Sequence, residues 1–362
     1  MTAEQKELLE KTKAERSWLK VHHPLRSLFW ECTLKCNLSC RHCGSNCLPS
    51  DRQRDMPLED FLPVLDEIAL HADPHKVMVF TVGGEPLVRP DIIDCGREIT
   101  NRGFSWGFVT NGMLLDYEML KKLIEVKLRS ISVSIDGLEE EHNWMRRNPR
   151  SFHRAVRAVK LLMLTRNVAW DVITCVNRRN LHQLPQLRDF FVSMGLKKWR
   201  IFTIFPAGRA KEDDKMILTP DEYNWLLHFI FETRVESRIH LSYCCEGYLG
   251  EYEGLVRDHA FRCDAGLMTA SILADGSISG CLSIRSKYDQ GNIYCDSFWE
   301  VWQNRFEVYR NREWMHRDEC QDCEAWQYCE GNGMHLRSDD GSLMLCNLHK
   351  LVSGIQSVGM LI

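Results

Sequence analysis

Residues 32–47 read CTLKCNLSCRHCGSNC, and within them Cys36, Cys40 and Cys43 have the spacing C-x3-C-x2-C. A [4Fe–4S] cluster needs one thiolate for each iron before all its irons are held by protein. Three cysteines on one short loop hold three irons and leave the fourth open to a small ligand with an amine and a carboxylate. Cys32 and Cys47 flank the three, and we expect both to pack in the interior. The alternative is a zinc site, which usually has paired C-x2-C elements.

This spacing resembles the radical S-adenosylmethionine (SAM) superfamily. In that family the open iron chelates SAM, and electron transfer from the cluster yields a 5'-deoxyadenosyl radical that abstracts hydrogen from a substrate. The resemblance implies that Cys36, Cys40 and Cys43 are the catalytic cluster ligands. It also implies a reductant such as flavodoxin or ferredoxin as a partner.

The composition is that of an ordinary soluble protein, with 362 residues of which 44% are hydrophobic and 27% are charged. A formal charge of −4 argues against a nucleic-acid partner. No uninterrupted apolar stretch approaches the length of a membrane span. The charged N-terminus does not resemble a signal peptide, so we expect the sixteen cysteines to be mainly metal ligands in a reducing cytoplasm rather than disulfides.

Strand and helix patterns alternate along the chain after residue 27. The strand patterns lie at 28–30, 77–82, 104–109, 130–135, 170–176 and 199–205, and helical patterns at 57–72, 90–102, 117–126, 152–165 and 181–194 separate them. This alternation predicts an α/β fold with a parallel sheet. Six strands match the partial six-stranded (β/α) barrel of the family that the cysteine loop resembles. Arg146, Arg147, Arg150, Arg154 and Arg157 lie in and before the 152–165 helix, and we expect them to form a solvated face.

The turns that follow the strands carry the residues expected to bind SAM, since ligands of parallel β/α folds lie at the carboxyl ends of strands. Gly83, Gly84, Glu85 and Pro86 match the GGEP motif, which in the family contacts the amino group of the methionine moiety. Glycines let the backbone approach a ligand, and Glu85 complements an ammonium group.

The same resemblance extends to later turns. It places Ser134, Asp136, Asn177 and the backbone near Gly208 along the nucleoside, and Thr110 and Asn111 in the pocket wall. For Ser134, Asp136 and Asn177 a strand-end turn without a ligand is an equally good interpretation. His42 stands where the family has an aromatic residue near the adenine, and a hydrogen bond to the cluster is the alternative role.

A second group of cysteines begins at Cys263 and contains Cys281, Cys320, Cys323, Cys329 and Cys346. Their spacing, C-x12-G-x4-C and then C-x2-C-x5-C and a last cysteine, resembles the SPASM extension of radical SAM enzymes that modify peptides and proteins. The resemblance implies that Cys320, Cys323, Cys329 and Cys346 enclose an outer auxiliary [4Fe–4S] cluster, with a four-cysteine zinc site as the alternative.

The inner auxiliary site departs from this pattern. Cys263 and Cys281 are its secure ligands, but Gly333 stands where the family has another cysteine. The remaining candidates are Cys244, Cys245 and Cys295, and no spacing rule chooses among them. We therefore predict an intact outer cluster beside an inner cluster that is non-standard, incompletely ligated by cysteine or absent.

These patterns divide the chain into five segments. They are an N-terminal helix and connection at 1–24, a radical SAM partial barrel at 25–218, a linking helix and bridge at 219–258, a small irregular SPASM-like cluster domain at 259–350, and a tail at 351–362. The resemblance covers roughly residues 25–350.

We interpret the chain as a radical SAM enzyme that abstracts hydrogen from a peptide or protein substrate during maturation. One alternative is a sulfatase-type maturase that oxidises Cys or Ser to formylglycine. Such maturases carry an aspartate after the second SPASM cysteine, where this chain has Leu282. The other alternative is a non-catalytic iron–sulfur or zinc scaffold.

Overall fold

The fold is built on one curved sheet of ten strands in the order β10-β9-β8-β1-β2-β3-β4-β5-β6-β7. It is seen in a computed structural model that describes residues 1–49, 55–244 and 246–351. The strands β1 (Ser27–Thr33), β2 (Met78–Gly83), β3 (Ser105–Thr110), β4 (Ser130–Ser134), β5 (Ala169–Val176) and β6 (Lys198–Thr203) pair in parallel with their neighbours. The predicted α/β fold with a parallel partial barrel is confirmed.

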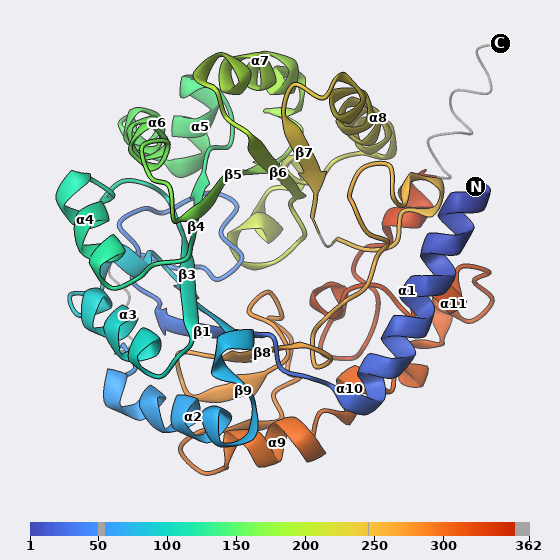
Figure 1. Ribbon diagram of the computed structural model, residues 1–362. Helices are drawn as coiled ribbons and strands as arrows, with labels where there is room; N and C mark the ends of the chain where they lie inside the picture. Colours follow the sequence, from blue (N-terminus) through green and yellow to red (C-terminus); the bar gives the residue numbers. More distant parts are fainter. Residues whose placement is uncertain (50–54, 245, 352–362) are drawn as a thin grey trace.

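Helices cover the outer face of the curved sheet (Figure 1). They are α2 (Leu58–His71), α3 (Ile92–Asn101), α4 (Tyr117–Glu125), α5 (Glu139–Arg146), α6 (Ser151–Leu162), α7 (Leu184–Met194) and α8 (Pro220–Glu236). In α2 the buried residues Phe61, Leu65 and Ile68 recur at helical spacing, which gives the helix one apolar face. Phe61 stacks on Trp30 of β1 at a ring-centroid distance of 4.1 Å, so the core lies between the sheet and this outer layer.

The sheet extends beyond the six predicted strands at both edges. β7 (His240–Tyr243) adds to β6 in parallel, and β8 (Thr269–Ile272) adds to β1 in parallel. β9 (Ser277–Ser279) and β10 (Gly291–Asn292) continue from β8 as an antiparallel meander. Segment 219–258, which we expected to link two parts, thus contributes α8 and β7 to the β/α alternation.

The N-terminal helix α1 (Ala3–His22) packs against the C-terminal part of the chain, beside α11 (Trp326–Cys329) (Figure 1). Thr2 and Gln5 form a capping box at its start. The Arg16 guanidinium donates to the carbonyl oxygens of Gln327 and Tyr328 at 2.8 and 2.6 Å. Two further helices of this region, α9 (Phe298–Asn304) and α10 (Glu307–Arg310), precede α11. Among the described residues, no helix is both long and apolar enough to cross a membrane.

Candidate active site

The three-cysteine loop lies between β1 and α2 and is fixed from two sides. The Cys36 amide donates to Leu48 O at 3.3 Å, which closes the loop on itself. From the turn after β6, Arg209 donates through Nε to Cys40 O at 2.7 Å and through Nη1 to Cys47 O at 3.1 Å.

The turn after β6 also contains Gly208, which we expected near the nucleoside, and its geometry explains why a glycine stands at this position. Its φ is +53°, and a Cβ there would lie 2.3 Å from Cys43 O. Gly208 thus lets this turn press against the backbone of the cysteine loop.

Cys36, Cys40 and Cys43 all line one cavity, and each thiol has a different polar neighbour. Asn111 Nδ2 lies 3.9 Å from Cys36 Sγ, and Arg146 Nη1 lies 3.7 Å from Cys40 Sγ. A hydrogen bond from the Cys47 thiol lowers the pKa of Cys43. Three thiols that converge on one space with donors beside them fit a cluster held by three thiolates.

Burial has a further consequence for this loop. It raises the pKa of Cys36 to about 12, so that thiol stays protonated near neutral pH until a metal replaces its proton. Cys32, by contrast, is fully buried and donates to Val82 O at 3.6 Å, which agrees with a packing role.

The cavity has a volume of about 730 Å³, within the usual range for small-molecule sites. It extends from the cysteine loop through the barrel interior to Ser130, Ala169 and Lys198 at the starts of β4, β5 and β6. Ala169 and Lys198 are exposed, so the cavity reaches solvent at this end. Its other wall includes Cys281, Leu282 and Ser283 from the C-terminal region.

Many of the predicted SAM-binding residues lie in this lining. Those in the lining are His42, Gly83, Gly84, Glu85, Thr110, Asn111 and Ser134, whereas Pro86, Asp136, Asn177 and Gly208 lie outside it. His42 sits between the second and third cysteines, and burial lowers its pKa to about 4, so its imidazole is neutral. The Asn177 side chain accepts from the amides of Arg179 and Asn180 at 2.7 and 3.2 Å, which shapes the turn after β5.

The GGEP turn packs tightly on the end of β1. A Cβ on Gly83 would lie 2.1 Å from Thr33 O, and a Cβ on Gly84 would lie 2.0 Å from Lys35 O. Glu85 is buried, and its carboxylate accepts hydrogen bonds from Thr110 Oγ1 at 2.7 Å and the Asn111 amide at 2.8 Å. Burial raises the pKa of Glu85 to about 6. The carboxylate therefore joins the turns after β2 and β3, in addition to facing the cavity.

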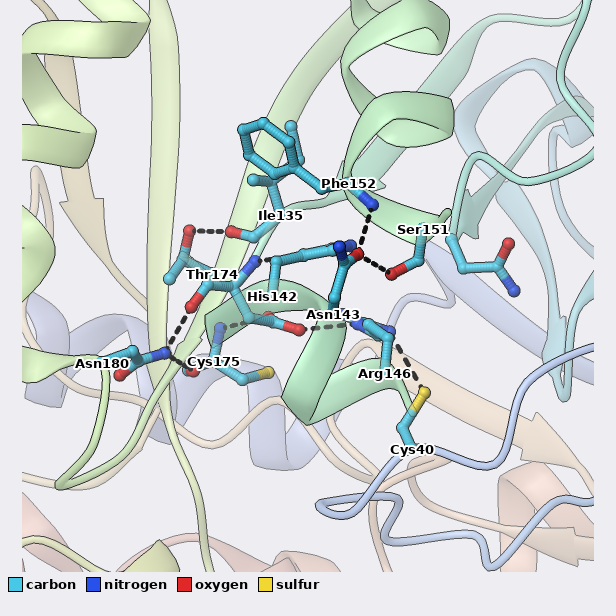
Figure 2. A network of polar contacts seen from close by, with 12 residues as sticks. Cys40, Ile135, His142, Asn143, Arg146, Ser151, Phe152, Thr174, Cys175 and Asn180 are labelled. Atoms are coloured by element: carbon cyan, nitrogen blue, oxygen red, sulfur yellow. Dashed lines mark hydrogen bonds and ion pairs between the residues drawn. The ribbon is translucent and has the colours of Figure 1, made fainter. Parts of the chain in front are cut away.

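A buried polar network supports the loop at Cys40 (Figure 2). Arg146 Nε donates to Asp136 Oδ2 at 2.6 Å, and its Nη1 points to Cys40. The other Asp136 oxygen accepts from the Cys175 amide at 3.0 Å, and the Asp136 amide donates to His142 Nδ1 at 3.0 Å. Desolvation is the largest single effect and alone would raise the pKa of Asp136, but Arg146, His42, His142 and the Cys175 amide together outweigh it, and the pKa falls to about 2.

This network corrects one sequence prediction. Arg146 is 8% exposed, so the expectation that it lies on a solvated face is wrong, although Arg147 and Arg150 are exposed. The reason is helix α5, which the sequence patterns did not predict and which turns Arg146 inward toward Asp136. The available signal was the acidic first turn, Glu139–Glu141, because carboxylates favour helix N-termini.

The barrel interior holds a cluster of polar side chains that line the same cavity as the cysteine loop. Arg200 forms an ion pair with Asp171 and donates through Nη2 to Ser132 Oγ at 2.7 Å. Aromatic rings line the same space, and Phe29 and Phe80 stack at a ring-centroid distance of 5.0 Å. Sequence reasoning did not single out these residues, because β-strand alternation marks a face but not what that face encloses.

The auxiliary cysteines fall into an outer and an inner group. Cys320, Cys323, Cys329 and Cys346 line one small cavity, which fits a cluster with four thiolates. Arg337 Nη2 donates to Cys320 Sγ at 3.3 Å. Cys263 and Cys281 form the inner group. Burial is the main reason that the pKa of Cys281 is raised, and the charge of Cys263 raises it further, so the two cysteines lie near each other.

Two parts of the chain match known families. Residues 30–191 match the model of the radical SAM superfamily, and residues 263–324 match SPASM, an iron–sulfur cluster-binding domain. An AdoMet-dependent heme synthase of Methanosarcina barkeri is 28% identical over 326 residues, covering 84% of this chain and 90% of that protein. Mycofactocin maturase of Mycolicibacterium smegmatis is 30% identical over 321 residues, covering 85% of this chain and 77% of that protein.

Solved structures share the architecture. The anSMEcpe structure with bound AdoMet and Cp18Cys peptide has a TM-score of 0.70 at 20% identity and covers 93% of this chain and 97% of that chain. Streptococcus suis SuiB bound to S-adenosylmethionine has a TM-score of 0.68 at 15% identity, covering 88% and 75%. At these identities the likeness establishes the fold.

Proposed function

Since this chain belongs to the radical SAM superfamily and carries a SPASM domain, we propose that it abstracts hydrogen from a peptide or protein substrate. Cys36, Cys40 and Cys43 would hold the radical cluster. When bound, the cluster and SAM supply a 5'-deoxyadenosyl radical that takes a hydrogen atom from the substrate.

The residues around the cavity have separable tasks in this proposal. Asn111 and Arg146 direct donors toward Cys36 and Cys40 and orient the thiolates. Glu85 supplies the negative charge beside the ammonium of SAM and fixes the Asn111 turn at the same time. Phe29, Phe80 and the wall at Leu282 keep water from the reacting carbon.

One observation carries the proposal: a single cavity joins the cysteine loop to an opening at the amino ends of β4, β5 and β6. A substrate that enters there approaches the cysteine loop through the barrel interior. One end of an extended peptide fits a cavity of this shape. The similarity to mycofactocin maturase and to folds solved with bound peptides supports a peptide.

A tetrapyrrole is the second candidate substrate. Relatives named AdoMet-dependent heme synthase and Fe-coproporphyrin III synthase align over most of this chain. The cavity offers stacked phenylalanines for an apolar ring, and Lys198 and Arg200 for anionic groups.

Formylglycine formation remains a further alternative, which the fold of anSMEcpe supports in part. Leu282 argues against it, because its apolar side chain lines the cavity where such maturases carry a carboxylate. The non-catalytic scaffold is disfavoured, since the chain belongs to a family of enzymes and its three cysteines face a cavity large enough for SAM.

An anaerobic deuterium-transfer assay tests the proposal. Candidate peptides encoded beside the gene are synthesised with deuterated side chains and mixed with reconstituted enzyme, SAM and dithionite. With the true peptide we expect deuterium to appear in 5'-deoxyadenosine. With Fe-coproporphyrin III in place of the peptide, we expect no deuterium in 5'-deoxyadenosine and no change in its yield.

The control is the Cys36→Ala/Cys40→Ala/Cys43→Ala protein, which should form no 5'-deoxyadenosine while keeping its auxiliary iron. If Fe-coproporphyrin III stimulated 5'-deoxyadenosine formation and no peptide transferred deuterium, the substrate would be a tetrapyrrole rather than a peptide. SAM cleavage by the triple variant would refute the assignment of the radical cluster.

A further inference from the structure

The space left by the missing cysteine is filled by a histidine. A Cβ built on Gly333 would lie 2.7 Å from Cε1 and 2.8 Å from Nδ1 of His335. The backbone of Gly333 has a φ of −70° and a ψ of 138°, which any residue adopts. Glycine is therefore not required for the conformation at this position, and its lack of a side chain makes room for the imidazole.

The His335 side chain has no polar role elsewhere. Within the described residues, neither ring nitrogen has a hydrogen-bond or ion-pair partner, and the ring meets Phe205 edge-on at 4.9 Å between centroids. An imidazole whose nitrogens have no polar partner in the protein has a lone pair available for a metal.

The segment that carries His335 is tied at both ends to the segments that carry the inner cysteines. Arg312 donates through Nη1 to Asn332 O at 3.1 Å and through Nη2 to Cys263 O at 3.5 Å. At the other end, Ser286 Oγ, five residues after Cys281, donates to Arg337 O at 2.5 Å. These contacts hold residues 332–337 against the inner site.

Two cysteine candidates for the inner site lie elsewhere, and the third, Cys245, is outside the described residues. Cys295 is exposed, and its neighbour Tyr294 donates to Asp60 of α2 at 2.9 Å. Cys244 follows β7, and the charges that act on its thiol come from Arg200, Glu246 and Asp171 of the barrel. The surroundings of these two cysteines are thus α2 and the barrel, whereas Arg312 and Ser286 join the segment of His335 to the segments of Cys263 and Cys281.

We propose that His335 replaces the missing cysteine as a ligand of the inner auxiliary iron–sulfur cluster, beside Cys263 and Cys281. Mixed ligation of this kind is chemically sound, because histidines replace cysteines on one iron of Rieske centres. Two thiolates and one imidazole leave the cluster with less negative charge than four thiolates would. The inference is independent of the substrate proposed above.

The test uses the full chain with Cys36, Cys40 and Cys43 changed to alanine, so that only auxiliary clusters are present. After anaerobic reconstitution and reduction, pulsed electron paramagnetic resonance should detect a ¹⁴N hyperfine coupling, which becomes a ¹⁵N coupling when histidine is ¹⁵N-labelled. In this background His335→Gln should lose the coupling and fall to roughly four irons per chain, the content of the outer cluster alone. The matched control is His316→Ala, because His316 stacks on Trp326 at 4.2 Å and should leave both signals unchanged.

A rescue variant guards against a simple folding defect. His335→Ala combined with Gly333→Cys restores the family cysteine and makes room for it, and should regain the inner iron without a nitrogen coupling. The proposal is overturned if the starting protein holds outer-cluster iron only, lacks a nitrogen coupling, or keeps that coupling in His335→Gln.

Discussion

Glu85 shows how one residue combines a ligand contact with a structural task. The sequence motif assigns it to the ammonium of SAM, while the fold commits its oxygens to Thr110, the Asn111 amide and the Leu87 amide. A cysteine or a GGEP turn is recognisable from its spacing alone. Thr110 and Asn111, which Glu85 joins to its own turn, lie 25 and 26 residues away, so this structural task was not readable from the sequence.

We expect Glu85→Gln to weaken SAM binding by roughly ten- to a hundredfold, because a charged hydrogen bond contributes about 1.5–3 kcal/mol. The amide of glutamine also places a donor against Thr110 or Asn111, which already donate to this position. Equilibrium dialysis of the reconstituted protein measures the affinity. Glu118→Gln, an exposed change on α4, is the control, and equal affinities for the two variants would leave Glu85 a structural role only.

Glu85 should also give folding stability a pH dependence. Its folded pKa of about 6 exceeds the ordinary value of 4.5, so the folded state binds more protons between these values. Glu85 should therefore lower the wild-type free energy of unfolding by about 1 kcal/mol as pH rises from 4.5 to 6, out of about 2 kcal/mol over the whole titration. Urea titrations across this interval should find this component of the slope absent in Glu85→Gln; identical slopes would contradict the pKa.

At the scale of elements, α5 links the barrel to the cysteine loop. Its last residue, Arg146, pairs with Asp136 after β4 and reaches Cys40, and Arg41 of the loop donates through its amide to Met145 O at 2.9 Å. The strands and most outer helices were predictable because their apolar periodicity is long. The eight residues of α5 are mostly polar, and their inward face serves a buried ion pair rather than an apolar core.

We expect Arg146→Met to destabilise the protein by about 3–5 kcal/mol, because it leaves the Asp136 carboxylate buried without its partner. Thermal unfolding measures the loss, and the second change Asp136→Asn should recover part of it. The neighbouring Arg147→Met is the control, since Arg147 is exposed. An Arg146→Met protein as stable as Arg147→Met would show that the ion pair contributes nothing to folding.

At the scale of the whole molecule, the C-terminal region completes the barrel as well as carrying cysteines. The cysteine spacings were sufficient to predict both halves, because ligand spacing is local in sequence. The joint between them was not predictable, since β8 pairs with β1 across more than 230 residues of chain. Glu31 of β1 forms a further link, an ion pair with Arg285 at 3.0 Å.

This joint predicts that the barrel does not fold alone. A chain ending at residue 258 would turn β1 into an open edge and leave Glu31, which is 3% exposed, without Arg285 and without the Ala274 amide. We expect this fragment to aggregate, and co-expression of residues 259–362 as a separate chain should restore a soluble complex with the cluster loop intact. Size-exclusion chromatography and circular dichroism measure both outcomes. A soluble, monomeric 1–258 fragment with cooperative unfolding would instead make the barrel an independent domain, and the pairing of β8 with β1 would then be an interface between two domains rather than part of one core.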